Sequence, residues 1–161
     1  MSRNFYKNIK DELNDLGFQI SDSNLEKPWG AYFCINENQA QDFSNKFFNS
    51  IDVDSLKVKN KLSPKILIVK PNMRLSWQYH NRRAEIWQAY KGQVGVVQSD
   101  SDNEKELKNY MPADQIKLRK GERHRLVGPS DYGVVAEIWQ HTDEIPSNED
   151  DIIRIQDDFN R

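Results

Sequence analysis

The sequence predicts an all-β fold, a sandwich or barrel built from many short strands. Short apolar or alternating segments recur along the chain, and turns rich in Gly, Pro, Asn and Asp separate them. The segment 66–69 is an unbroken apolar run, which is typical of a strand buried on both faces. Helical spacing occurs in only two stretches, both in the first third of the chain.

The first predicted element is a helix over residues 2–16. Its apolar residues recur every three or four positions, and Gly17 is a suitable C-cap. We expect the apolar stripe to brace the barrel or to form a dimer contact. Residues 18–26 are predicted to be a linker, so the chain divides into an N-terminal helix and linker (1–26) and a β-domain (27–161).

A strand is predicted at 31–35, and an insertion over 36–63 follows it. Phe43, Phe47 and Ile51 lie four residues apart, which predicts a helix near residues 38–49. Two interpretations of this helix remain open. It either forms a lid over a pocket or covers a sheet edge.

The remaining strands follow residue 64. They are predicted at 66–69, 74–80, 85–90, 93–98, 109–114, 115–118, 123–127 and 132–139. The pair 85–90 and 93–98 is expected to form a hairpin across Lys91-Gly92. Residues 99–108 are polar and predict a solvated loop, and the tail 150–159 is short and amphipathic.

Composition limits the class of function. The chain has 161 residues, which suits one domain, and its 11% aromatic content argues against disorder. A net charge of -2 does not favour nucleic-acid or anionic-membrane partners. The single cysteine, Cys34, excludes an intrachain disulfide. No apolar run approaches the roughly 20 residues of a membrane span, and no signal-peptide core is present, so we expect a cytoplasmic protein.

A candidate metal site lies around residues 74–92. Gln78 and His80 are two positions apart on a predicted strand, so their side chains share a face. Glu85 follows after a short turn, and His124 lies on a later strand. An amide oxygen, imidazole nitrogens and a carboxylate that meet at one point form a site for a first-row divalent metal.

Spacing alone leaves a second interpretation open. His80 can be a surface histidine, and Glu85 can pair with Arg82 or Arg83. If the metal site is real, its two nitrogen and two oxygen donors fit Zn²⁺, Mn²⁺, Fe²⁺, Co²⁺ or Ni²⁺ and do not choose between them.

The pattern Gln-x-His-x4-Glu-x6-Gly, followed by Gly-x-x-His-Arg-Leu at 121–126, resembles the two cupin motifs. The variant with Gln as first ligand is similar to phosphomannose isomerases, in particular to the type II mannose-6-phosphate isomerase domain. The matching signatures lie in the family's order at 27–30 (Lys-Pro-Trp-Gly), 69–71, 75–80, 83–87, 124–126 and 149–154. The resemblance implies a cupin-type double-stranded β-helix, a jelly-roll barrel, over residues 27–161.

The resemblance also implies an activity: isomerisation of mannose 6-phosphate to fructose 6-phosphate at a metal bound by Gln78, His80, Glu85 and His124. Zn²⁺ is the first expectation, because the resembling isomerases bind it at this ligand set. The expected partner is a small-molecule sugar phosphate, and a homodimer is expected. This domain is often fused to a GDP-mannose pyrophosphorylase, which is absent here, so GDP-mannose synthesis is not expected.

The implied reaction moves a proton between C1 and C2 through an enediol. It needs an acid–base group near the metal and a cation for the phosphate. The resemblance favours Arg125 as that cation, with Arg83 second. Alternation on a strand, however, sends Arg125 to the face opposite His124 unless the chain bends. Glu137 and Asp143 are the candidate acid–base groups.

The chain departs from the family pattern around this ligand set. His80-Asn81-Arg82 stands where relatives carry three histidines, and Arg119-Lys120 replaces a Pro-Ala. These changes favour an alternative, a non-catalytic cupin that binds a sugar phosphate or sugar nucleotide. A non-haem iron oxygenase is a third interpretation, since two His and one carboxylate form a facial triad. Gln78 as a further ligand argues against it.

Overall fold

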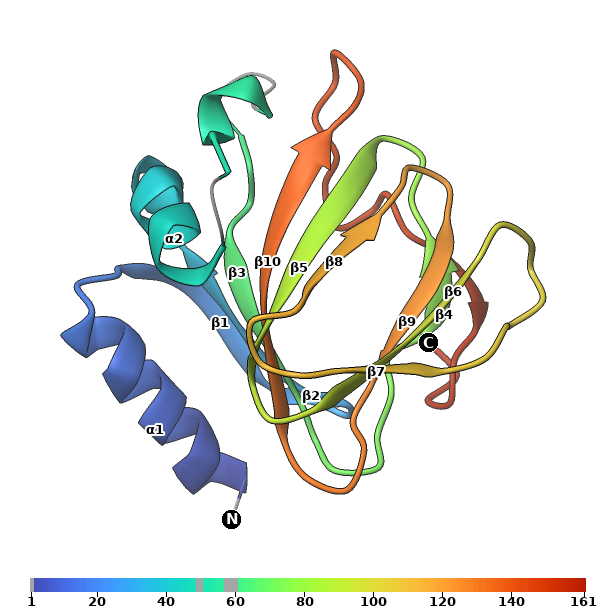
Figure 1. The fold of residues 1–161 in the computed structure, drawn as a ribbon, viewed down its shortest axis with the longest axis horizontal. Coiled ribbons are helices and arrows are strands. Elements are labelled where there is room, and N and C mark those ends of the chain that lie inside the picture. Colours follow the sequence, from blue (N-terminus) through green and yellow to red (C-terminus); the bar gives the residue numbers. More distant parts are fainter. Residues whose placement is uncertain (1, 49–50, 57–60) are drawn as a thin grey trace.

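The computed structural model describes residues 2–48, 51–56 and 61–161. Two antiparallel sheets face each other as a jelly-roll barrel (Figure 1), which confirms the predicted all-β fold. The six-stranded sheet has the order β1 (Ile20–Lys27), β2 (Gly30–Ile35), β3 (Lys65–Val69), β10 (Gly133–His141), β5 (Arg83–Lys91) and β8 (Gln115–Leu118). The five-stranded sheet has the order β11 (Ile153–Gln156), β4 (Trp77–Tyr79), β9 (Arg123–Val127), β6 (Val94–Ser99) and β7 (Lys108–Tyr110).

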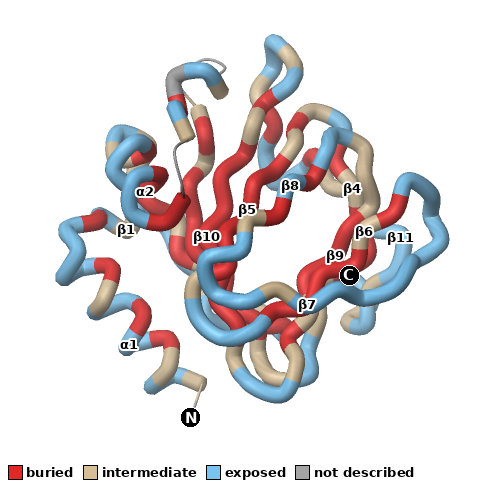
Figure 2. Tube along the Cα trace, viewed as in Figure 1, coloured by how far each residue is buried: buried red, intermediate tan, exposed pale blue. Residues whose placement is uncertain are grey.

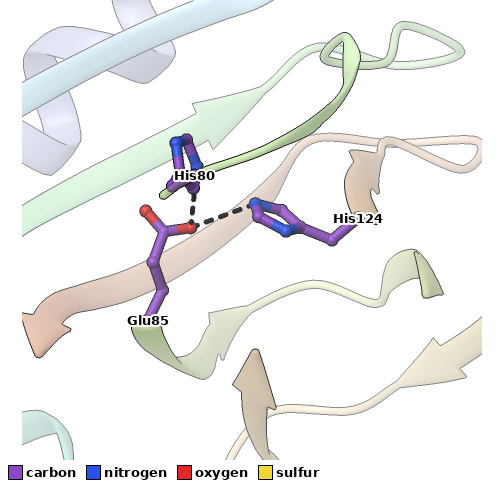
Figure 3. A group of neighbouring side chains, drawn as sticks. All are labelled: His80, Glu85 and His124. Atoms are coloured by element: carbon purple, nitrogen blue, oxygen red, sulfur yellow. Dashed lines mark ion pairs between the residues drawn. The ribbon is translucent and has the colours of Figure 1, made fainter. Parts of the chain in front are cut away.

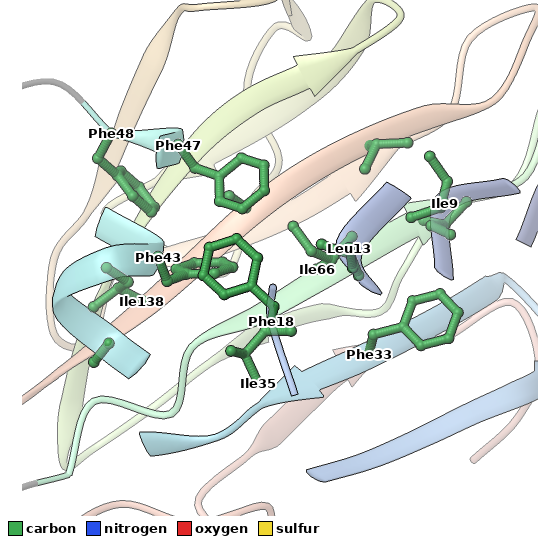
Figure 4. Close-up of a cluster of buried hydrophobic side chains, with 14 of the residues drawn as sticks. Ile9, Leu13, Phe18, Phe33, Ile35, Phe43, Phe47, Phe48, Ile66 and Ile138 are labelled. Atoms are coloured by element: carbon green, nitrogen blue, oxygen red, sulfur yellow. The ribbon is translucent and has the colours of Figure 1, made fainter. Parts of the chain in front are cut away.

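Helix α1 (Ser2–Asp15) confirms the predicted N-terminal helix. Its buried residues Tyr6, Ile9 and Leu13 belong to an apolar cluster shared with the six-stranded sheet (Figure 4), so α1 braces the outside of the barrel. The helix ends as expected at Gly17, whose φ is +89°. The amide of Phe18 then donates to the Leu13 carbonyl at 3.0 Å.

The insertion carries η1 (Glu37–Gln39), helix α2 (Ala40–Phe47) and η2 (Val53–Ser55). Phe43 and Phe47 enter the same cluster as α1 (Figure 4), which explains their spacing. The predicted end of this helix at Asn49 lies outside the described residues. Among the described residues of 36–63, none lines the cavity beside Glu85 that is described below. In that part of the chain α2 covers the sheet, as one of the two interpretations predicted.

Strand β3 shows why its sequence is apolar throughout. Ile66 and Ile68 pack into the outer cluster with the helices, whereas Leu67 and Val69 pack into the barrel interior. The strand is therefore buried on both faces, and all five of its residues are buried. Figure 2 shows that most residues of the neighbouring strands β10 and β5 are buried as well.

The predicted linker over 18–26 is wrong. Most of it forms β1, which pairs with β2 and places Ser23 opposite Phe33. This strand lies at the edge of its sheet and most of its side chains are exposed. Main-chain pairing rather than an apolar face stabilises it, so its sequence carries no strand pattern. Strand β1 also runs across the predicted division between residues 26 and 27.

The predicted hairpin across Lys91-Gly92 is also wrong. Strand β5 pairs with β10 and β8, whereas β6 pairs with β9 and β7 in the other sheet. The turn therefore carries the chain from one sheet to the other. Gly92 has a φ of +71°, and a side chain there would meet the Tyr132 carbonyl oxygen at 2.4 Å.

The other predicted strands are present with shifted ends. The segment 74–80 contains β4 and an isolated bridge between Arg74 and Val127, and 109–114 retains only the end of β7. Strands β8 and β9 have the predicted bounds. In the described part of the chain, no helix is long and apolar enough to cross a membrane.

Candidate metal centre

Three buried side chains converge between the two sheets (Figure 3). Glu85 lies on β5 of the six-stranded sheet, and His124 lies on β9 of the five-stranded sheet. His80 directly follows β4. One potential ligand atom from each lies within 4.8 Å of the others. The structure thus brings together three of the four predicted ligands.

The hydrogen bonds of the two imidazoles fix their orientation. His80 Nδ1 lies 2.6 Å from the Asp151 carbonyl oxygen, and His124 Nδ1 lies 3.0 Å from the Glu122 carbonyl oxygen. Because a carbonyl oxygen only accepts, each Nδ1 carries the hydrogen and each Nε2 presents a lone pair. Glu85 Oε1 lies 3.2 Å from His124 Nε2 and 3.7 Å from His80 Nε2.

This arrangement fits a metal ion. In the described structure, Glu85 Oε1 and His124 Nε2 are buried without a hydrogen-bond partner. Three lone-pair donors that face one another repel unless a cation lies between them, and buried polar atoms without a partner are costly. A divalent ion would satisfy all three, so the cluster can hold one.

The charges of the cluster suit the same role. Burial, helped by Arg83, lowers the pKa of His80 to about 4, so its imidazole is neutral and able to ligate at neutral pH. Burial also opposes ionisation of Glu85. Arg83 and His80 outweigh that effect and hold the pKa of Glu85 well below its usual value, so this group is a carboxylate.

The fourth predicted ligand, Gln78, lies beside the cluster with its nitrogen toward it. Gln78 Nε2 is 3.4 Å from His80 Nε2, and Gln78 Oε1 accepts a hydrogen bond from the Ser76 hydroxyl. A half-turn of the amide exchanges the two atoms, and the Ser76 hydroxyl can accept from an amide nitrogen. The ligand role of Gln78 therefore stays a prediction.

Arg83 reaches the same site and orients Glu85. Its Nε donates to Glu85 Oε2 at 3.0 Å, which leaves Oε1 facing the histidines. One terminal nitrogen donates to the Ser147 hydroxyl at 3.0 Å, and the other lies 3.3 Å from His80 Nε2. The guanidinium carbon also stacks 3.5 Å from the centre of the Trp139 ring.

Arg125 does not reach the site. It follows His124 on β9, and its guanidinium uses its donors elsewhere, on the Leu75 carbonyl at 3.0 Å, on Glu104 at 3.1 Å and on Gln156. The side chain is fully buried in these contacts and does not line the cavity. The phosphate role predicted for Arg125 therefore lacks the required geometry, because strand alternation governs its direction.

Glu137 lies on β10, directly between Lys65 of β3 and Trp87 of β5. Its Oε1 accepts a hydrogen bond from Trp139 Nε1 at 3.1 Å. Burial first and the charge of Glu85 second raise the pKa of Glu137 well above its usual value, although Lys65 opposes them. The carboxyl of Glu137 is thus harder to ionise than that of Glu85, a difference typical of acid–base pairs.

Asp143, the other acid–base candidate, is placed elsewhere. It pairs with Lys120 at 3.3 Å, and both side chains are partly exposed. Asp143 does not line the cavity that contains Glu85 and Glu137. The structure therefore does not bring it to the site.

A cavity of about 250 Å³ adjoins the cluster and is lined by Gln78, Arg83, Glu85 and Glu137. Its other lining residues are mainly aromatic or cationic: Trp29, Tyr32, Trp87, Trp139, Lys27, Lys65, Arg154 and Arg161. Aromatic faces and charged donors together suit a small, polar, anionic ligand.

The residue that holds the turn at 80–83, Asp151, was not identified from the sequence. The Asp151 carboxylate accepts from the amides of Asn81 at 3.0 Å and Arg82 at 2.9 Å, and from the Ser147 hydroxyl at 2.6 Å. Asp151 lies in the family signature at 149–154, and this signature was the only feature of the sequence that pointed to a role for Asp151.

Comparisons with known proteins identify the family and support the fold. A family model described as mannose-6-phosphate isomerase C-terminal matches residues 45–157. Alginate biosynthesis protein AlgA of Pseudomonas aeruginosa is 26% identical over 162 residues, which cover 96% of this chain and 27% of that protein. Xanthan biosynthesis protein XanB of Xanthomonas campestris pv. campestris is 27% identical over 140 residues, 84% of this chain and 23% of that protein. The chain thus spans about a quarter of the length of these relatives.

Solved structures are similar in fold. Oxalate decarboxylase from Bacillus subtilis matches with a TM-score of 0.58 and 13% identity, over 83% of this chain and 30% of that one. Vicilin from Solanum lycopersicum matches with a TM-score of 0.54 and 17% identity, over 81% and 32%. These likenesses support the double-stranded β-helix expected of a cupin.

Proposed function

The chain belongs to the mannose-6-phosphate isomerase C-terminal family, and from this premise we propose that it is a metal-dependent sugar-phosphate isomerase. Its proposed reaction converts mannose 6-phosphate to fructose 6-phosphate. One observation carries the proposal: buried lone pairs of His80, Glu85 and His124 converge beside a cavity of aromatic and cationic residues.

In this proposal His80, Glu85 and His124 hold the metal, and Gln78 joins them after its amide turns. Zn²⁺ is the first choice, and Mn²⁺, Fe²⁺, Co²⁺ and Ni²⁺ suit the same donors. When bound, the ion supplies a Lewis acid that stabilises negative charge on a sugar oxygen. Arg83 acts as a positioning residue, because its donors hold Glu85 and Ser147.

Glu137 is the proposed acid–base group. It lines the cavity, and its raised pKa makes its carboxylate form a stronger base, which can take the proton from C2 of the sugar and return it to C1. Glu137→Gln keeps the volume and removes the transferable proton. We expect this variant to retain metal and lose turnover; normal turnover would exclude the role.

A second candidate function is a non-catalytic cupin that binds a sugar phosphate. Asn81 and Arg82 occupy positions where the family pattern has histidines, and neither side chain lines the cavity. Their amides bind Asp151 instead. The absence of these two histidines favours a protein that still binds the metal and the sugar phosphate but does not catalyse the isomerisation.

A coupled assay on metal-analysed protein tests the proposal by following fructose 6-phosphate formed from mannose 6-phosphate. His80→Ala is the control. We expect turnover that disappears in the control and after chelation, and that returns to chelated wild type with added Zn²⁺ or Co²⁺. No turnover with metal fully bound would refute the isomerase and favour the binding function. Bound iron with oxygen uptake would point to an oxygenase.

A further inference from the structure

We propose that Arg154 and Lys27 form a phosphate subsite at the solvent side of the cavity. This inference rests on the proposed function, which places the reacting end of a sugar phosphate at the metal centre. It also restricts the ligand to sugars that carry the phosphate at the far end from the reacting carbons.

Five cationic residues line the cavity. Three of them are held by a carboxylate at 2.8–3.0 Å, namely Lys65, Arg83 and Arg161. Within the described residues, Lys27 and Arg154 form neither an ion pair nor a side-chain hydrogen bond. These two cations are therefore available to an anionic ligand.

Strand pairing places Arg154 in line with the metal centre. Arg154 of β11 lies directly opposite Gln78 of β4, and Gln78 lies directly opposite His124 of β9. Side chains of directly opposed residues share a face, so Arg154 projects on the same side as His124. Two strand spacings separate them, about 10 Å between main chains. The row thus has a metal ligand at one end and a free guanidinium at the other.

Lys27 approaches from the other sheet. It is the last residue of β1, the edge strand of the six-stranded sheet, whereas β11 is an edge strand of the five-stranded sheet. Both residues line the same cavity. A phosphate between these edges can take two hydrogen bonds from the flat guanidinium and a point charge from the ammonium group.

The subsite predicts selectivity. In a hexose 6-phosphate the reacting carbons and the phosphate lie at opposite ends of the open chain, which matches the separation of the metal centre and Arg154. A hexose 1-phosphate carries its phosphate on a reacting carbon and cannot place the two groups at the two ends. A neutral hexose leaves both cations without a partner.

Binding is measured by tryptophan fluorescence, since three tryptophans line the cavity. The probes are mannose 6-phosphate, mannose and inorganic phosphate, each with metal-loaded and chelated protein. We expect Arg154→Ala and Lys27→Ala each to weaken binding of both phosphate-bearing probes about tenfold and to leave mannose binding unchanged. Arg119→Ala and Lys10→Ala, at exposed cations outside the cavity, are matched controls. Arg154→Gln also removes the positive charge but retains more of the side chain than Arg154→Ala, so it separates the effect of the charge from that of lost packing.

The outcomes separate this inference from the proposed function. Unchanged affinity for mannose 6-phosphate in both alanine variants would overturn the subsite, even if the wild type isomerises. Equal wild-type affinity for mannose and mannose 6-phosphate would also overturn it. Loss of phosphate binding in the variants supports the subsite even if the wild type shows no turnover, in which case only the isomerase assignment fails.

Discussion

Replacing Asp151 by Asn removes a charged acceptor that holds the turn at residues 80–83, which carries the candidate metal ligand His80. Asp151 is 5% exposed, and its carboxylate accepts hydrogen bonds from the amides of Asn81 and Arg82 and from the Ser147 hydroxyl. The Asn side chain has one acceptor oxygen, and its amide nitrogen would face at least one of these three donors, so at least one hydrogen bond is lost. A hydrogen bond to a charged group contributes about 1.5–3 kcal/mol, so we expect a loss of about 2–4 kcal/mol in the free energy of unfolding.

The same substitution should weaken metal binding. The main-chain oxygen of Asp151 fixes the tautomer of His80 at 2.6 Å, so a shifted turn misplaces that ligand. Loss of such outer support typically costs about 10–100-fold in metal affinity. Urea unfolding of chelated protein gives the stability, and zinc titration gives the affinity. Asp150→Asn is the matched control, because Asp150 is the exposed neighbour of Asp151 and its carboxylate does not bind the turn at residues 80–83 in the described structure.

The pH dependence gives a separate check. Burial opposes ionisation of Asp151, but the Ser147 hydroxyl and the two amides lower its pKa below the usual value. Its contribution is therefore complete above the unfolded-state pKa near 3.9 and is lost as pH falls further. The stability gap between wild type and the Asp151→Asn variant should shrink below about pH 4. Equal stability and equal zinc affinity of the two Asn variants at pH 7 would refute this reasoning.

Three further predictions concern the ligand set, the buried histidine and the helical brace. Gln78→Ala should lower zinc retention in dialysis against a chelator if the amide oxygen is a fourth ligand; unchanged occupancy would contradict that role. Burial lowers the pKa of His141 to about 4, so the unfolded state takes up the proton first and stability should fall as pH drops from about 6.5 to 4. Urea unfolding should show a smaller fall over this range in His141→Gln, and an identical fall would argue against it. Leu13→Ala should destabilise the chain by about 3 kcal/mol, because Leu13 is 1% exposed in the outer cluster. Urea unfolding measures this, with exposed Leu16→Ala as control, and an equal effect of both would count against bracing by α1.

Local sequence pattern predicted the features that depend on local geometry. The period-two spacing of Gln78 and His80, and the apolar run of β3, follow from strand geometry alone. The same geometry correctly opposed Arg125, whereas resemblance favoured it. The residues that hold its guanidinium, Glu104 and Gln156, lie 21 and 31 positions away, so no local pattern could reveal them.

The missed features depend on which segments pair. An edge strand such as β1 needs no apolar face, so its sequence does not differ from that of a loop. A turn at Gly92 serves a hairpin or a crossing between sheets equally well. Which of these occurs depends on whether β6 packs against β9 or β5, and that choice is made by the whole barrel.

The position of the centre explains why polar residues are tolerated in this core. Glu85 belongs to one sheet, and His124 belongs to the other, with His80 directly after its neighbouring strand β4. A bound ion would therefore link the two sheets at a point where hydrogen-bond acceptors, and not apolar side chains, face each other. In the described part of the chain, the helices pack on the outside of the six-stranded sheet, and the inner face of the five-stranded sheet carries the row from His124 to Arg154. This arrangement of the two sheets fits a function that needs a metal ion beside His124 and, at the other end of the row, the cation Arg154, which is unpaired among the described residues.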